Sequence, residues 1–416
     1  MAATVQPEQV VARVPSASNV SQVWDIDVPT MERFLQDLEK KNAVRFTAQQ
    51  LCSFTNNYSK VLGSGGFGVV YGGQFPNGVK IAVKVLKKSL PHERAQRQFM
   101  AEVSTIGRTC HINLVRLYGF SYDHLMSAIV YEYMENGSLD KYLFNADAHG
   151  IDGNKLLDIA IGTAKGIAYL HEECQQRIIH YDIKPSNVLL DANFNPKVAD
   201  FGLAKICNRE NTHDSSIGYK GTPGYSAPEF LLNNYPITYK CDVYSFGMLL
   251  FEIVGRRRNA RVGSIDSLDW FPKLVWEEYE KDELATMILS HGIEENDIER
   301  AKRMAVVALW CVQDSPEARP PMNAVVKMLE GGVEIMPPPK PFLYLFSVGI
   351  NLLNPPIYTG NSSDNSTGNG THSNWYKEHS TRIMDEYKIQ VASSSQEKED
   401  HGSSYAEEKS RSVDSS

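Results

Sequence analysis

The pattern of hydrophobic and polar positions divides the chain into a strand-rich part and a later helix-rich part. Residues 69–74 and 79–86 are rich in β-branched side chains, which predicts two strands. Asn77 and Gly78 stand between these runs, and both residue types tolerate positive φ. The pattern therefore predicts a hairpin in the first half of the patterned region.

Helical spacing dominates the second half. Leu157, Ile161, Ala164 and Ala168 recur at intervals of three or four residues, which predicts a helix with one buried face. The same kind of signal predicts helices at residues 31–41, 94–108, 243–254 (ended by Gly255) and 322–329. Strands followed by helices favour an α+β fold.

Composition changes at both ends of the patterned region, which spans residues 54–332. Residues 1–53 are expected to form a partly disordered N-terminal extension. Ser, Asn, Gly and charged residues dominate from Thr359 onward. Such a segment buries too little apolar area to offset its ordering entropy, so residues 333–416 are expected to form a largely disordered tail.

Charge and cysteine usage exclude several protein classes. The chain carries 42 Lys and Arg against 50 Asp and Glu, a net charge of -8, which argues against a nucleic-acid partner. The six cysteines show no C-x-x-C spacing, so neither a zinc site nor a disulfide framework is expected, and a reducing compartment is favoured. Because no apolar run reaches the about 20 residues that cross a bilayer, no transmembrane segment is predicted and the expected location is cytoplasmic.

A glycine-rich segment at residues 63–68 lies between two strand-like runs. Glycines without Cβ let backbone N–H groups approach phosphate oxygens closely. A dinucleotide-binding turn of the Rossmann type is the competing interpretation, but it needs a helix directly after the glycines. A strand rich in β-branched residues follows here, which favours a hairpin folded over a nucleoside triphosphate such as ATP.

The next strand and helix carry a lysine and a glutamate. Ala82 and Lys84 share one side of the strand, opposite the apolar side of Ile81 and Val83. A small Ala leaves room for a flat base while Lys84 reaches phosphates. Glu102 borders the apolar stripe of the following helix, and a partly buried carboxylate needs a cation, so Lys84 is its expected partner.

The densest chemical signal spans residues 180–187 and 200–202. Phosphoryl transfer needs metal ligands, a proton acceptor and a cation that offsets phosphate charge. The segment supplies Asn187 and Asp200 as ligands of Mg²⁺, Asp182 as the catalytic base and Lys184 as the cation.

These motifs, in this order, resemble the eukaryotic protein kinases, and among them the plant receptor-like kinases. The resemblance covers residues 54–332. It implies a bilobal fold, with a β-rich N-lobe at 54–134 that contains one major helix, a helical C-lobe at 135–332, and ATP with Mg²⁺ in the cleft. The implied ATP-binding residues are Leu62, Gly63, Ser64, Gly65, Gly66, Phe67, Gly68, Val70, Ala82, Lys84, Glu102, Glu132, Met134 and Leu189.

The resemblance also assigns supporting roles. Tyr131 matches the gatekeeper position before the hinge, and Asp242 matches the aspartate that braces the catalytic loop. Glu229 is expected to pair with Arg319. Lys184 and Thr222 are typical of serine/threonine kinases, with Thr222 expected to contact Asp182, although dual specificity stays open.

One position departs from the family pattern. Tyr181 stands where most kinases have the arginine that binds a phosphate on the activation loop. An uncharged ring cannot take that role, so phosphates on Ser215, Ser216 or Thr222 are not expected to switch the activity on. Replacing Ser215 and Ser216 by alanine should therefore leave activity intact.

The resemblance implies an ATP-dependent serine/threonine kinase in plant receptor-linked signalling, including defence. Protein substrates and a membrane receptor or receptor-like kinase are the implied partners, with peripheral attachment at the plasma membrane through such a partner. Either a receptor-like cytoplasmic kinase or the intracellular part of a receptor fits the sequence. The alternative function is a catalytically weak or dead scaffold, although Lys84, Asp182 and Asp200, which such scaffolds usually lose, are all present.

Overall fold

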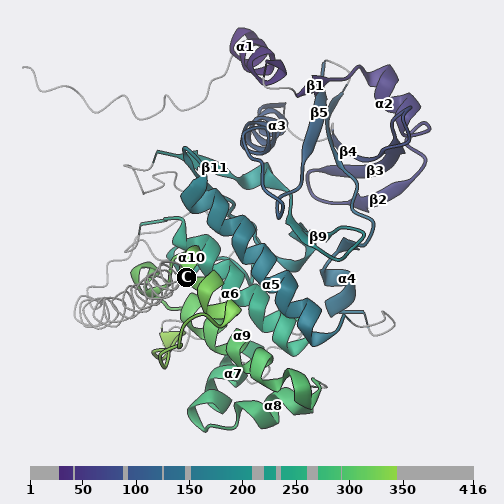
Figure 1. Ribbon diagram of the computed structural model, residues 1–416. Coiled ribbons are helices and arrows are strands. Elements are labelled where there is room, and N and C mark those ends of the chain that lie inside the picture. Colours follow the sequence, from purple (N-terminus) through teal and green to yellow (C-terminus); the bar gives the residue numbers. More distant parts are fainter. Residues whose placement is uncertain are drawn as a thin grey trace, which may run out of the picture. The chain divides into compact units, whose positions relative to one another are not determined.

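The computed structural model describes residues 28–40, 43–87, 92–123, 126–145, 151–208, 220–230, 236–259, 270–291 and 293–343. Two compact units divide the chain between Ala43 and Val44. The first unit contains α1 (Val28–Glu39), which confirms the helix expected near residues 31–41. The second unit contains both lobes of an α+β fold, as expected (Figure 1).

A six-stranded sheet forms the first lobe of the second unit, in the order β1-β5-β6-β4-β3-β2. Its strands are antiparallel, except that β1 runs parallel to β5. Their bounds are β1 Val44–Arg45, β2 Val61–Ser64, β3 Gly68–Gln74, β4 Lys80–Leu86, β5 Leu117–Tyr122 and β6 Ser127–Glu132. The predicted hairpin is confirmed between β3 and β4, where Gly78 adopts φ of 89°.

Two helices cover opposite faces of this sheet (Figure 1). Leu51 of α2 (Ala48–Phe54) packs against Ile81 and Val83 of β4 in a buried cluster. On the other face, Phe99 of α3 (His92–Ile106) makes an edge contact with Phe120 of β5. Side chains alternate between the two faces along a strand, so each face of the sheet presents its own apolar side chains. One helix packs its apolar stripe against each of these faces.

The start of the first lobe differs from the predicted boundary at Phe54. Phe46 N donates to Phe120 O over 2.7 Å, which ties β1 to β5, and Thr47 begins α2 with a capping box completed by Gln50. Phe46 and Phe54 then join the aromatic contacts above the sheet. Residues 44–53 therefore belong to the lobe, a result of long-range pairing that the local composition does not reveal.

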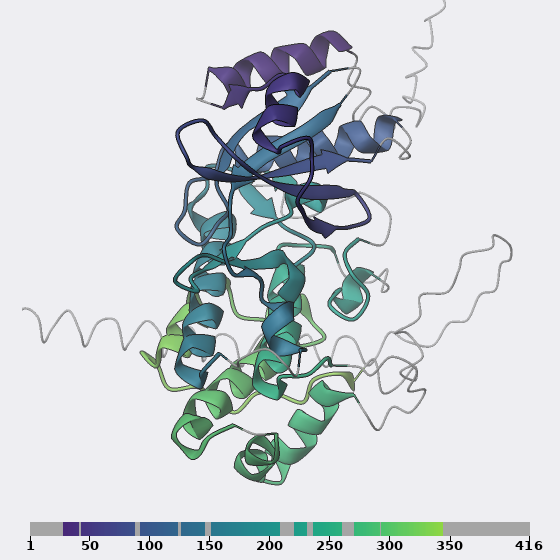
Figure 2. The same cartoon turned by 90° about the vertical axis from the view of Figure 1, so that its right-hand side faces the viewer.

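The second lobe is mainly helical, as expected (Figure 2). Helix α6 is buried along most of its length, and α5 and α9 pack against it. Its helices are α4 Asp140–Leu143, α5 Gly153–Ala168, α6 Lys240–Gly255, α7 Phe271–Glu280, α8 Leu284–Ser290, α9 Ile298–Cys311 and α10 Met322–Glu330. Short strands complete it: β7 Gly137–Ser138, β8 Arg177–Ile179, β9 Val188–Leu190, β10 Pro196–Val198 and β11 Lys205–Cys207.

One detail of the predicted helices was wrong. The buried face of α5 includes Leu156, Ile159 and Ala160, whereas Leu157 is only half-buried. Gly255 is the last residue of α6, as predicted, and Arg256 follows it as the C-cap with φ of 47°.

The second lobe also extends beyond the predicted end at residue 332. Phe342 is fully buried and its ring lies 4.7 Å from that of Trp270. Trp310 Nε1 donates to Met336 O over 2.9 Å, and Gln313 Nε2 donates to Pro339 O over 2.9 Å. Residues 333–343 therefore pack on the lobe, and the remaining tail of residues 344–416 lies outside the described residues.

Glu229 and Arg319 form the ion pair that the family pattern implied. Arg319 is fully buried, and its two terminal nitrogens donate to the two carboxylate oxygens of Glu229 over 2.7 and 2.8 Å. Carbonyls of Gln313, Lys240 and Asp314 accept further hydrogen bonds from the same guanidinium. The pair fixes the end of the segment at residues 220–230 to the turn that precedes α10.

Replacing Arg319 by methionine is expected to lower the free energy of unfolding by roughly 3–5 kcal/mol, because Glu229 would be left as a buried charge without its partner. Urea unfolding followed by tryptophan fluorescence measures this. The double variant Arg319→Met/Glu229→Gln should recover part of the loss. A double variant less stable than Arg319→Met alone would contradict the explanation.

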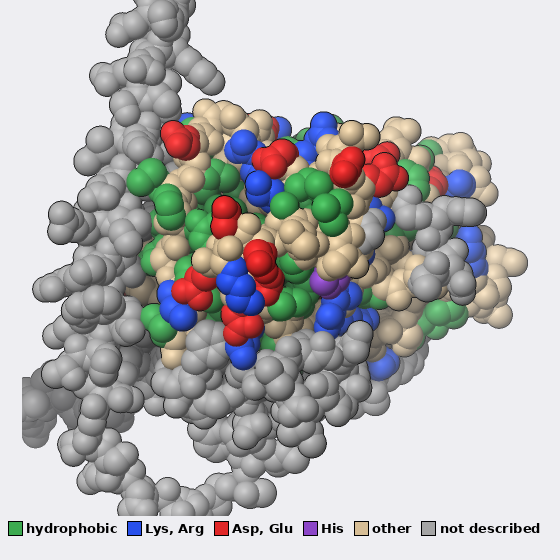
Figure 3. Space-filling view, turned by 90° about the horizontal axis from the view of Figure 1, so that it is seen from below, with side chains coloured by type: hydrophobic (Ala, Val, Ile, Leu, Met, Phe, Trp, Pro, Cys, Tyr) green, Lys and Arg blue, Asp and Glu red, His purple; other side chains and the backbone are tan. Residues whose placement is uncertain are grey.

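The exposed face seen in Figure 3 carries acidic and basic side chains that intermingle, with apolar patches between them. None of the helices within the described ranges is long and apolar enough to span a bilayer.

Candidate active site

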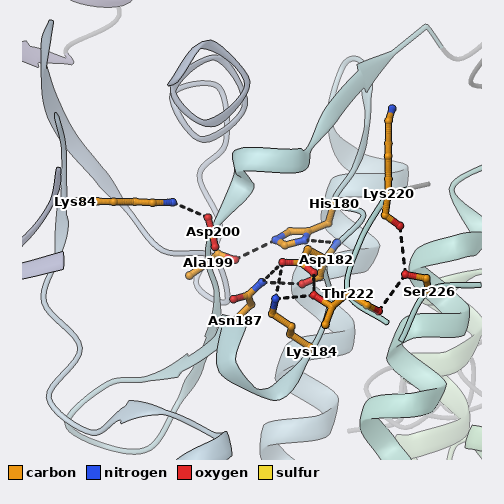
Figure 4. A network of polar contacts seen from close by, with 10 residues as sticks. All are labelled: Lys84, His180, Asp182, Lys184, Asn187, Ala199, Asp200, Lys220, Thr222 and Ser226. Atoms are coloured by element: carbon orange, nitrogen blue, oxygen red, sulfur yellow. Dashed lines mark hydrogen bonds and ion pairs between the residues drawn. The ribbon is translucent and has the colours of Figure 1, made fainter. Parts of the chain in front are cut away.

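Lys84 joins three elements at the centre of the site. It lies on β4 opposite Val70 of β3, and its Nζ lies 2.9 and 2.8 Å from the two carboxylate oxygens of Glu102 on α3. The same Nζ lies 2.6 Å from Oδ1 of Asp200 (Figure 4). The predicted pairing of Lys84 with Glu102 is confirmed, and one ammonium connects β4, α3 and the segment after β10.

Tyr131 adds a contact that the sequence did not reveal. Its hydroxyl donates to Oε1 of Glu102, and both residues are buried. The contact depends on the register of the sheet, since Tyr131 of β6 pairs with Ala82 of β4, two residues before Lys84. Lys84 and Tyr131 therefore orient the Glu102 carboxylate together.

Lys84 and Asp200 hold each other in the ionised state, whereas burial raises the pKa of Glu102. Burial alone would lower the pKa of Lys84, but the carboxylates of Glu102 and Asp200 outweigh burial and raise it. Burial would likewise raise the pKa of Asp200, but the Lys84 ammonium outweighs burial and lowers it. Asp200 is thus kept as a carboxylate, the form that binds a divalent cation.

Asp182 is the centre of a second cluster, shown in Figure 4. Thr222 Oγ1 donates to Oδ1 of Asp182 over 2.5 Å, as the sequence predicted. Lys184 Nζ lies 2.8 Å from Oδ2 of Asp182 and 2.7 Å from Thr222 Oγ1. Asn187 Nδ2 donates to Oδ2 and to the main-chain oxygen of Asp182, over 3.0 and 2.8 Å. A carboxylate, a cation and a hydroxyl therefore meet at one point.

Asp242 of α6 holds the backbone of the loop that carries Asp182. It accepts hydrogen bonds from the N–H groups of His180 and Tyr181, over 2.7 and 2.8 Å, which confirms its predicted bracing role. The fully buried His171 lies 2.9 Å from the same carboxylate, measured from Nε2 to Oδ2. No local sequence pattern predicted a role for His171, which lies far from Asp242 along the chain.

Asn187 and Asp200 offer oxygen atoms that fit a magnesium ion. The amide nitrogen of Asn187 faces Asp182, so its Oδ1 is the atom that a cation would meet. Asp200 meets Lys84 through Oδ1, which leaves Oδ2 for the cation. No group of three or more His, Cys, Asp or Glu side chains within the described part of the chain could hold a metal alone. A cation here would complete its shell with phosphate oxygens and water.

The glycine-rich loop joins β2 to β3. Gly65 N donates to Gly68 O over 2.9 Å, and an added Cβ at Gly63, Gly65 or Gly66 would meet no atom within 4 Å. At Gly68 an added Cβ would lie only 2.5 Å from Val85 O, so only glycine fits between β3 and β4. Because β3 follows the loop directly, the dinucleotide-binding alternative is excluded.

The remaining predicted nucleotide-binding residues come from four strands, the glycine-rich loop and the segment after β6. Leu62 lies on β2, Val70 on β3 and Ala82 on β4, and all three are half-buried. Leu189 of β9 is also half-buried, and the exposed Ser64 and half-buried Phe67 belong to the glycine-rich loop or its border. Met134 follows β6 and is largely buried.

Glu132, at the end of β6, has a role beyond the predicted nucleotide contact. Its side-chain Oε1 accepts a hydrogen bond from Arg116 N over 2.7 Å and lies 3.1 Å from Lys197 Nζ. Lys197 belongs to β10, so the carboxylate links the two lobes. The Glu132 side chain is engaged in these contacts, so the predicted adenine contact of this residue would fall to its main chain.

Glu252 is a buried carboxyl near the segment that carries Thr222. It accepts a hydrogen bond from the Tyr225 hydroxyl over 2.6 Å and from Asn259 N over 3.0 Å. Burial raises its pKa from 4.5 to about 7. Between these two values the folded protein keeps a proton that the unfolded chain has lost.

The free energy of unfolding is therefore expected to fall as the pH rises from about 4.5 to about 7, by at most about 1.4 kcal/mol per pH unit from this group, and then to level off. Glu252→Gln should remove this part of the pH dependence of the free energy of unfolding. Urea unfolding of both proteins at pH 5, 6 and 8 measures it, and parallel pH profiles would refute the assignment.

Comparison with known proteins agrees with this geometry. The sequence pattern of the protein tyrosine and serine/threonine kinase family matches residues 57–329, and the chain belongs to that family. Several of the similar proteins within it are named as receptor-like kinases of Arabidopsis thaliana.

Three relatives illustrate the similarity. Rust resistance kinase Lr10 of Triticum aestivum is 43% identical over 321 residues, which cover 75% of this chain and 50% of the relative. A G-type lectin S-receptor-like serine/threonine-protein kinase of Arabidopsis thaliana is 46% identical over 316 residues, or 74% of this chain and 35% of the relative. The PR5-like receptor kinase of Arabidopsis thaliana is 42% identical over 306 residues, which cover 72% of this chain and 45% of the relative. This chain spans half or less of the length of these relatives.

Proposed function

We propose that this chain is an ATP-dependent serine/threonine kinase that transfers the γ-phosphoryl group of Mg-ATP to hydroxyls of proteins. The observation that carries the proposal is the cluster of Asp182, Lys184 and Thr222 beside Asn187. A carboxylate with 5% of its surface exposed and three polar partners is well placed to receive a hydroxyl proton.

The two clusters divide the chemical work. Lys84 and Lys184 offset negative charge, Lys84 on the phosphates held by the glycine-rich loop and Lys184 on the group in transfer. Asn187 and Asp200 would hold Mg²⁺, which when bound neutralises phosphate charge. Asp182 orients the acceptor hydroxyl and takes its proton.

The names of the relatives support a setting in receptor-linked signalling. Several are called disease-resistance or rust-resistance kinases, and others are called receptor kinases. We propose a role in plant defence signalling, in the cytoplasm, with attachment to the plasma membrane through a receptor or receptor-like kinase partner. Ser215 and Ser216, whose phosphates we propose to be dispensable, lie outside the described residues.

The test is transfer of labelled γ-phosphate by the purified chain to generic serine/threonine acceptors, with and without Mg²⁺. Metal-dependent transfer that Asp182→Asn abolishes supports the kinase. The competing scaffold function predicts nucleotide binding at most, with no transfer by the wild-type protein. Phosphoamino-acid analysis of the product then distinguishes serine and threonine from tyrosine.

A further inference from the structure

Tyr181, the residue that replaces the usual arginine, contacts a cation. Its side chain is buried, with 3% of its surface exposed, and Lys220 Nζ lies 4.7 Å from the centre of its ring. Phe230 packs edge-on against the same ring at 5.9 Å. An ammonium over an aromatic face is attracted by the negative charge of that face.

The backbone next to Lys220 fits closely against the catalytic loop. Gly221 adopts φ of 99°, and a Cβ there would lie 2.7 Å from the Tyr181 carbonyl oxygen. The segment can therefore approach the loop this closely only with glycine at position 221. Tyr181 is itself fixed, because its N–H donates to Asp242.

The residues after Lys220 form the segment that reaches the catalytic base. Ser226 Oγ donates to the carbonyl oxygens of Lys220 and Thr222, over 3.2 and 3.0 Å. Thr222 in turn contacts Asp182 and Lys184. Figure 4 shows the main chain of Lys220 turned toward Ser226 and its side chain extending away from Asp182. The Lys220 side chain thus anchors the start of a short segment whose other contacts position Thr222.

We propose that Lys220 is a positioning residue, whose cation–π contact with Tyr181 holds residues 220–226 against the catalytic loop without a phosphate. This inference deepens the proposed function and rests on it for its kinetic consequences. The usual arrangement joins an arginine on the loop to an anion on the segment. Here the cation lies on the segment and the neutral ring on the loop, so an added phosphate would have no cation at position 181 to bind.

The central variant is Lys220→Met, which keeps most of the side-chain length and removes the charge. We expect kcat/KM for a protein substrate to fall about threefold to thirtyfold, the range of a partly buried cation–π contact, with KM for ATP unchanged. Lys220→Arg should restore most of the activity, because a guanidinium also stacks on an aromatic ring. Lys302→Met, which removes a partly exposed lysine from α9, is the matched control.

Tyr181 variants test the partner. Tyr181→Phe keeps the ring and should behave like the wild type, whereas Tyr181→Leu should lose as much as Lys220→Met. The Lys220→Met/Tyr181→Leu double variant should be no worse than the poorer single variant. Additive losses, or an unchanged kcat/KM in Lys220→Met on phosphatase-treated protein, would overturn the proposal.

Amide hydrogen exchange gives a measurement that does not depend on catalysis. Tyr225 N and Ser226 N donate to Thr222 O over 3.1 and 3.2 Å. Their exchange should become about threefold to thirtyfold faster in Lys220→Met and stay near the wild-type rate in Lys220→Arg. Unchanged exchange in Lys220→Met would contradict the positioning role of Lys220, even if the wild-type protein transferred no phosphate. Failure of this proposal can therefore be distinguished from failure of the proposed kinase function.

Discussion

Replacing Asp182 by asparagine is expected to lower kcat by about two to four orders of magnitude, the usual contribution of a positioned general base. Asparagine has nearly the same shape, and its carbonyl oxygen can still accept from Thr222 or Lys184. The change therefore removes proton acceptance with little change in packing. Steady-state phosphate transfer, with calorimetric titration of Mg-ATP, measures the two effects separately.

Affinity for Mg-ATP should stay within a few-fold of the wild type, because Asp182 is not among the proposed nucleotide or metal ligands. Asp158→Asn, a change at an exposed aspartate of α5, is the matched control and should leave kcat unaltered. An Asp182→Asn protein with kcat near that of the wild type would remove Asp182 from the mechanism.

Replacing Lys84 by methionine is expected to lower kcat/KM for ATP by about two to three orders of magnitude, as when an aimed electrostatic donor is lost. The same change leaves Glu102 and Asp200 without the ammonium that both contact. Two carboxylates near each other then lack a shared cation, so a loss of stability is also expected. Transfer kinetics and urea unfolding, run on the same preparation, separate the two losses.

Lys80→Met offers a control on the same strand. The side chain of Lys80 is 60% exposed and lies 3.8 Å from Glu135. Because this ion pair is exposed, removing Lys80 is expected to change the free energy of unfolding by less than about 1 kcal/mol. If Lys80→Met and Lys84→Met lost equal activity, the charge of β4 in general, and not the buried ammonium, would account for the effect.

The sequence was sufficient to predict the parts of the site whose residues lie close together in one local motif. Asp182, Lys184 and Asn187 lie within six residues, so one catalytic loop brings them together, and the structure confirms their contacts. The pairing of Lys84 with Glu102 could be predicted as well, because a strand and the next helix adjoin in most folds.

Contacts that depend on sheet register or on distant segments could not be predicted. The Tyr131 hydroxyl meets Glu102 only because β6 pairs with β4 in one register. His171 reaches Asp242 across 71 positions of the chain. The boundaries failed for the same reason, since Phe46 and Phe342 are placed by partners far away in sequence.

Strand β1 has a consequence for how this lobe behaves in solution. A short parallel strand covers β5, which would otherwise be the outermost strand and offer its unpaired N–H and C=O groups to other molecules. Gly119 permits this cover, because any Cβ there would collide with Val44 O at 2.0 Å. A chain shortened to begin at Phe54 would lose both this protection and Leu51, and would be prone to aggregate through the uncovered edge.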